Sequence, residues 1–157
     1  MQNVATELAP TALEEIVSGL TQALAETAVE TTKAQNFHWN VQGMSFGQLH
    51  EMFEEIYKDH FEAQDDLAER IKALDAHAEG RYSVWLSRSK VVENEGTESA
   101  REMVEILMRD QEQLAGVLAA LAAVSEKHGD ALTNDLAVGR ARVHEKFAWM
   151  LRAHLKD

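Results

Sequence analysis

The chain has 157 residues, of which 45% are hydrophobic, and it carries a formal net charge of −12 at neutral pH. This length and apolar content suit one compact domain, while the charge argues against a broadly basic, phosphate-binding surface. The sequence contains no cysteine, so disulfides and thiolate metal sites are excluded and any metal needs nitrogen and oxygen ligands. With no secretory leader and no run of about 20 apolar residues, we expect a soluble, cytoplasmic protein.

The first predicted helix runs from about Pro10 to Trp39, after a short tail of residues 1–9. Thr11 and Glu14 have the spacing of a capping box, and proline is tolerated at a helix start. Apolar side chains recur on one face of this segment at Leu13, Ile16, Val17, Leu20 and Leu24.

A second helix is predicted from Ser45 to about Leu74 or Asp75, after a short loop that contains glycine. Ser45 and Gln48 have capping-box spacing. The apolar stripe of this helix is Leu49, Phe53, Ile56, His60, Ala63, Leu67, Ile71 and Leu74. Because His60 lies on that stripe, we predict a hydrogen-bonded core histidine there rather than a metal ligand.

The periodicity lapses over residues 76–95, where residues 82–90 are predicted to form a short helix. A third long helix begins near Thr97 or Ser99, where Ser99 and Glu102 have capping-box spacing, and ends near residues 127–129. The fourth begins near Asp130 or Thr133 and continues to the C-terminus. Two short loops and one long crossover predict an all-α, ferritin-like four-helix bundle over residues 10–157.

A second stripe on the second predicted helix carries candidate metal ligands: His50, Glu54, Asp65 and Glu69. These side chains span about 100° of the helix surface and point away from the apolar stripe. Glu54 and Asp65 are separated by about 16 Å of helix, too far to bind one ion together. If two copies pack antiparallel about a two-fold axis, the histidine end of one faces the acidic end of the other. The spacing therefore predicts a site shared by two subunits.

Imidazole with carboxylates suits ferrous iron, although zinc and copper also bind such ligand sets. His38 is returned beside the second helix by the short loop and can add a second nitrogen. The alternative interpretation is that these charged residues form an ordinary solvated face. Iron sites inside a single bundle use Glu-x-x-His pairs, and none of the seven histidines has a glutamate three residues before it.

Three segments closely resemble the signature of the Dps family: residues 37–43 (FHWNVQG), 50–53 (HEMF) and 65–70 (DDLAER). The resemblance extends over essentially the whole chain. It implies a ferroxidase centre in which one subunit contributes His38, His50 and Glu54 and its two-fold mate contributes Asp65 and Glu69. It further implies a twelve-subunit shell that oxidises Fe(II), preferably with hydrogen peroxide, and stores ferric mineral. Trp39 matches the family's aromatic residue near the site. The resemblance implies that it donates an electron, and the alternative is that it only packs at the interface.

The sequence departs from the family pattern at two places. Glu54 stands where the family usually has aspartate, and one extra methylene shifts the carboxylate by more than about 1 Å. The first basic residue is Lys33, so the chain lacks the lysine-rich tail through which many members bind DNA. We therefore expect weak or absent DNA binding and no nucleoid association.

Acidic residues near the start of the last helix resemble in position those lining the family's iron-entrance pores: Glu126, Asp130 and Asp135. Ordinary helix N-terminal acids explain them equally well. The main hypothesis is an iron-oxidising, iron-storing enzyme that protects against oxidative damage. The alternatives are a DNA-binding nucleoid protein with little ferroxidase activity and a metal-free assembly scaffold.

Overall fold

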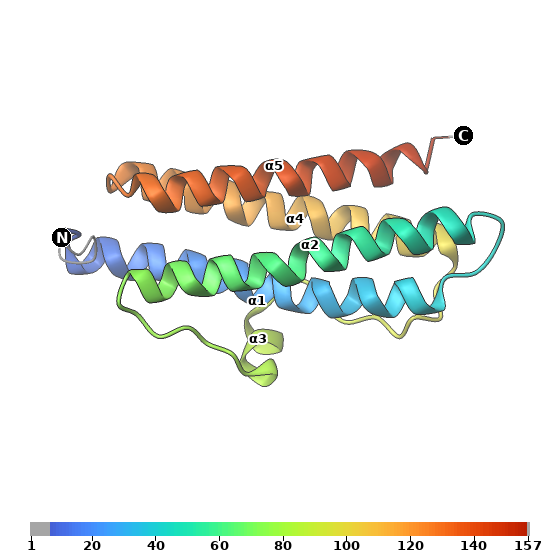
Figure 1. The fold of residues 1–157 in the computed structure, drawn as a ribbon, viewed down its shortest axis with the longest axis horizontal. Coiled ribbons are helices and arrows are strands. Elements are labelled where there is room, and N and C mark those ends of the chain that lie inside the picture. Colours follow the sequence, from blue (N-terminus) through green and yellow to red (C-terminus); the bar gives the residue numbers. More distant parts are fainter. Residues whose placement is uncertain (1–6, 157) are drawn as a thin grey trace.

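The computed structural model describes residues 7–156, and this part of the chain is helical without a strand. The helices are α1 (Pro10–Asn40), α2 (Phe46–Ala73), α3 (Tyr82–Arg88), α4 (Ala100–Lys127) and α5 (Ala131–Ala153). Four long helices lie side by side, and the short α3 stands outside them in the crossover (Figure 1). The predicted bundle with a short helix in its crossover is confirmed.

The helices pack as two antiparallel pairs, α1 with α2 and α4 with α5. Helix α1 also contacts α4 and α3, which ties the two pairs and the crossover together. In the described residues, no helix is both long enough and apolar enough to span a bilayer.

Of the three expected capping boxes, only the one at Ser99 and Glu102 forms. The prediction at Thr11 was wrong because Pro10 is already the first helical residue, which places Thr11 inside α1. The prediction at Ser45 was also wrong. Ser45 has φ −96° and ψ 14°, not the extended backbone (φ −64°, ψ 158°) that lets the Ser99 hydroxyl reach back to its helix.

The core consists of two apolar clusters with a polar layer between them. One cluster lies at the α1–α2 loop end and includes Phe37, Phe53, Ile56, Met103, Leu107 and Leu151. The other lies toward the α4–α5 turn and includes Ile16, Leu20, Leu67, Ile71, Leu118 and Leu121. Buried polar side chains from all four long helices fill the middle: Glu30, Lys33, His60, Gln111, Arg140 and His144. The prediction that His60 is a hydrogen-bonded core residue is confirmed.

Candidate metal centre

His38 and His50 form a pair across the α1–α2 loop. His38 is in the last turn of α1 and His50 is near the start of α2. The two imidazoles stack with centroids 3.7 Å apart and planes inclined by 15°. The Nδ1 atom of each lies 2.7 Å from the backbone carbonyl oxygen of the other. The short loop therefore holds both imidazoles in one defined orientation.

These reciprocal hydrogen bonds determine the tautomers of His38 and His50. A carbonyl oxygen can only accept, so Nδ1 of each imidazole must carry the proton and donate it. The lone pair of each neutral imidazole is then on Nε2, the arrangement found in metal-binding histidines whose other nitrogen is held by a carbonyl. The pair thus presents two nitrogen ligands before any metal arrives.

Glu54 follows His50 by one turn of α2, on the same face of the helix. Its Oε1 atom lies 3.0 Å from Nζ of Lys58 and 3.4 Å from the hydroxyl of Tyr57. The hydrogen bond from Lys58 lowers the pKa of Glu54, so this carboxylate is ionised at neutral pH. Tyr57 also sets its aromatic ring edge-on against His38, with centroids 5.2 Å apart. Tyr57 and Lys58 were not among the predicted site residues, although helical spacing places both on the same face of α2 as His50 and Glu54.

Asp65 and Glu69 lie farther along α2 and are exposed. Asp65 lines a groove of about 780 Å³ together with Phe61, Glu62 and Trp85. Between residues 7 and 156 of the single chain, no three histidine or acidic side chains are close enough to bind one metal ion. The structure thus brings His38 and His50 together, with Glu54 one turn away, and leaves the acidic pair at a distance.

Trp39 is adjacent to His38 in sequence, and 67% of its surface is exposed. Phe46, on α2, is also exposed. Phe46 stacks on His50, with centroids 5.0 Å apart. These aromatic side chains give the surface around the histidine pair an apolar character.

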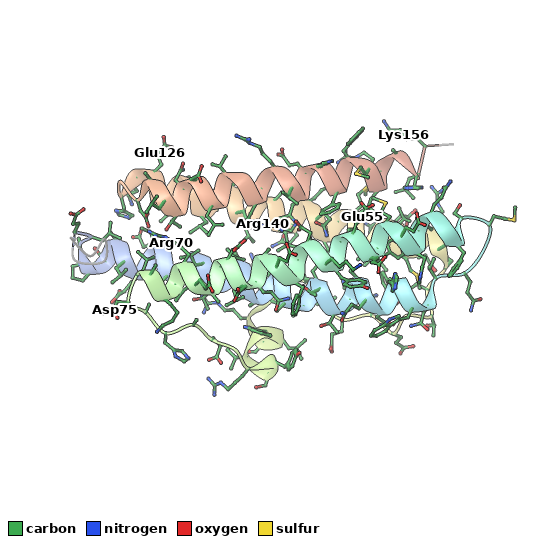
Figure 2. The ribbon with its side chains drawn as sticks, viewed as in Figure 1. Glu55, Arg70, Asp75, Glu126, Arg140 and Lys156 are labelled. Carbon is green, nitrogen blue, oxygen red and sulfur yellow. The ribbon has the colours of Figure 1, made fainter. Side chains whose placement is uncertain are left out.

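The three candidate pore residues have different environments. Glu126 and Asp135 are exposed near the α4–α5 turn, whereas Asp130 is 2% exposed. Asp130 caps α5 by accepting from the Thr133 backbone N–H at 3.0 Å and also pairs with Arg70 at 2.9 Å. Burial opposes ionisation of Asp130, but the hydrogen bonds from Thr133 and the Arg70 charge lower its pKa. Figure 2 shows Arg70 toward this end of the bundle. The carboxylate of Asp130 therefore has a structural role within the chain. The pore stays a prediction.

Comparison with known proteins places these observations in a family. The model of the Ferritin-like domain matches residues 17–157. DNA protection during starvation protein 2 of Bacillus anthracis is 36% identical over 144 residues, which cover 92% of this chain and 99% of the relative.

Solved structures agree with the sequence matches. The crystal structure of Dps from Staphylococcus aureus has a TM-score of 0.89 and 33% identity, covering 92% of this chain and 97% of that one. A Dps protein from Vibrio cholerae, described as a member of a broad superfamily of ferritin-like diiron-carboxylate proteins, has a TM-score of 0.90 and 32% identity. That likeness covers 95% of this chain and 94% of the other.

Proposed function

This chain belongs to the Dps family of ferritin-like proteins, and on that basis we propose that it is a ferroxidase. It oxidises Fe(II) at sites shared by two subunits and stores the ferric product inside a hollow shell, most simply a dodecamer. The observation that carries the proposal is the histidine pair, whose Nε2 atoms are free for a metal while each Nδ1 is held by a carbonyl.

The register of α2 supports a shared site. Counted along the sequence, His50 and Glu69 are equally far from the midpoint between residues 59 and 60. Glu54 and Asp65 are also equally far from this midpoint. A two-fold axis through that point therefore sets His50 opposite Glu69 of the partner subunit and Glu54 opposite the partner's Asp65. Both pairs form in one register, which gives two equivalent sites for each pair of subunits.

The ligands suit the oxidation of Fe(II) by hydrogen peroxide. Two neutral imidazoles and three carboxylates bind Fe(II), and the carboxylates stabilise the higher charge of Fe(III). Peroxide accepts one electron from each of two Fe(II) ions and, with two protons, becomes two water molecules. Iron and peroxide are consumed together without releasing a hydroxyl radical, so the activity protects against oxidative damage. Zn(II) fits the same ligands and is expected to inhibit.

The test is stopped-flow oxidation of Fe(II) by peroxide, together with the mass of the assembly by light scattering. We expect an oligomer that oxidises two Fe(II) per peroxide, and a rate lowered about 100-fold or more in His50→Ala and Asp65→Ala. Glu55→Ala, which removes an exposed carboxylate of α2 outside the ligand stripe, is the matched control and should keep the rate. A monomer, or unchanged oxidation in both ligand variants, would overturn the proposal.

DNA binding is the second candidate function, since several relatives are named for DNA protection. We predict that the assembly does not retard a short DNA duplex in a gel at about 0.15 M salt. The net charge is −12, and Lys33, the first basic residue, is buried and paired with Asp110. A retarded band at that salt concentration would show that another surface of the protein binds DNA.

Lys58 competes with iron for Glu54, because its ammonium group occupies one oxygen of the expected ligand. We predict that Lys58→Met raises the affinity for Fe(II) by about twofold to fivefold, the size expected for an exposed ion pair. Anaerobic titration with Fe(II) measures this, and Lys146→Met on α5 controls for the loss of one positive charge. Equal changes in the two variants would mean that net charge, not the contact with Glu54, sets the affinity.

A further inference from the structure

A closed hydrogen-bond cycle lies in the polar layer at the middle of the bundle. It passes through Asp59 and His60 of α2, Gln111 of α4, and His144 and Arg140 of α5. His60, Gln111 and His144 are 0% exposed and Arg140 is 9% exposed. Figure 2 shows Arg140 near the middle of the long axis. None of these residues belongs to the proposed iron site.

Each contact of the cycle has hydrogen-bonding distance. His60 Nδ1 lies 2.9 Å from Asp59 Oδ2, and His60 Nε2 lies 3.0 Å from the Gln111 side-chain nitrogen. The Gln111 oxygen lies 2.6 Å from His144 Nδ1, whose Nε2 is 3.4 Å from an Arg140 nitrogen. Arg140 closes the cycle with two contacts to Asp59, at 2.7 and 3.0 Å.

Hydrogen bonds are donated from Arg140 toward Asp59 along both arms of the cycle, directly and through His144, Gln111 and His60. Arg140 can only donate and ionised Asp59 can only accept, so His60 donates from Nδ1 and accepts at Nε2 from the Gln111 amide. The Gln111 oxygen then accepts from Nδ1 of His144, whose Nε2 faces the Arg140 donor. The cycle is complete only while both imidazoles are neutral, because each Nε2 faces a donor.

The groups around the imidazoles do not favour a second proton. Burial lowers the pKa of His60 and, more strongly, that of His144, and the Arg140 charge adds to both effects. On α2, the negative charge of Asp59 favours protonation of the imidazoles. Burial raises the pKa of Asp59, but the hydrogen bonds from His60 and Arg140 outweigh this effect and lower it.

Helices α1 and α4 supply the remaining charged groups near the two imidazoles. Glu30 of α1 accepts from Gln111 at 3.1 Å, and burial and the nearby Asp110 of α4 raise its pKa well above the usual range. This environment favours the neutral carboxyl of Glu30, which adds no negative charge to the imidazoles. Lys33 is neutralised by its contact with Asp110.

We propose that this cycle is an acid-sensitive lock that fastens α2 to α4 and α5. Protonation of either imidazole points an N–H at an existing donor, which opens the cycle and separates the helices at mid-bundle. The inference does not depend on the proposed iron chemistry.

The sign of the pH dependence follows from proton binding. Both histidines have lower pKa values in the folded chain than the usual value near 6.5, so below that pH the unfolded chain binds more protons. The lock is fully effective above about pH 6.5 and is lost as the pH falls below it. With two such groups, the unfolding equilibrium constant rises by up to about 100-fold for each pH unit between 6.5 and the lower pKa values of the folded protein.

The experiment is denaturant unfolding of the full assembly at fixed protein concentration between about pH 5 and 8. We expect His60→Gln and His144→Gln each to reduce the pH dependence by about tenfold per pH unit, since each removes one titrating group. His77→Gln and His154→Gln, two exposed histidines outside the cycle, are the controls and should keep the wild-type dependence. If His60→Gln and His144→Gln leave the pH dependence of unfolding unchanged, the proposal is overturned.

A second measurement needs no variant and keeps the proposal testable if those chains fail to fold. Hydrogen–deuterium exchange at the imidazole carbon between the nitrogens, read by mass spectrometry, gives the pKa of each histidine in the wild-type protein. We expect the pKa of His60 to lie below the usual value near 6.5 and that of His144 to lie well below it. Titration of the two buried histidines near 6.5 would contradict the lock.

Discussion

Mixing two inactive variants, His50→Ala and Asp65→Ala, should restore about one quarter of the wild-type iron oxidation when the chains are co-assembled at random. In a mixed pair of subunits, one site takes its histidines from the Asp65→Ala chain and its acids from the His50→Ala chain. That site is complete, and the other site carries both defects. Half of the pairs are mixed, so about one quarter of all sites are intact.

The matched control for this experiment is a mixture of His50→Ala with Glu54→Ala. Both positions are on the same side of the shared site, so every site in a mixed pair lacks one ligand and no activity should return. Stopped-flow oxidation of Fe(II) by peroxide, on assemblies whose composition is verified by mass spectrometry, measures both mixtures. Recovery in neither mixture would contradict a site shared by two subunits.

Gln111→Leu should lower the free energy of unfolding by about 3–9 kcal/mol, since each of the three buried polar partners left unpaired costs about 1–3 kcal/mol. The Gln111 amide is the hub of the polar layer: it donates to Glu30 and His60 and accepts from His144. Leucine has a similar volume, so the loss comes mainly from these three unsatisfied groups. Denaturant unfolding at about pH 7.5, with protein concentration fixed, measures it.

Gln113→Leu is the matched control on the same helix. Gln113 is half-buried and makes one side-chain hydrogen bond, to Glu26 at 3.1 Å. We expect Gln113→Leu to lower the free energy of unfolding by about 1 kcal/mol, the usual contribution of one such hydrogen bond. Equal losses in the two variants would show that the mid-bundle cycle adds no stability beyond ordinary hydrogen bonds.

The sequence predicted the helices well because each is a long amphipathic segment whose period is visible without its neighbours. The first predicted helix ended one residue before the observed α1, at Trp39 instead of Asn40. Cap prediction was weaker. Thr11 and Ser45 have the right residue types, but the backbone around them does not have the conformation that the spacing assumes.

The pairing of His38 with His50 could be expected from the short loop between them, but its reciprocal hydrogen bonds could not. His144 was not assigned a role, although it follows Arg140 and precedes Phe147 and Leu151 at helical spacing, which indicates an inward position. Likewise, nothing in the sequence showed that Asp130 is held by Arg70, sixty residues away. Each of these contacts joins different helices.

The sequence alone therefore determined the helix pattern and the outward stripe on α2, and it led to the proposal of a second subunit, because these depend only on rise and rotation along one helix. Tertiary structure decided which polar side chains meet: the orientation of the histidine pair, the pairing of Asp130 with Arg70 and the cycle around Gln111. Such pairings depend on the relative shift and rotation of separate helices, which residue spacing within one helix does not encode.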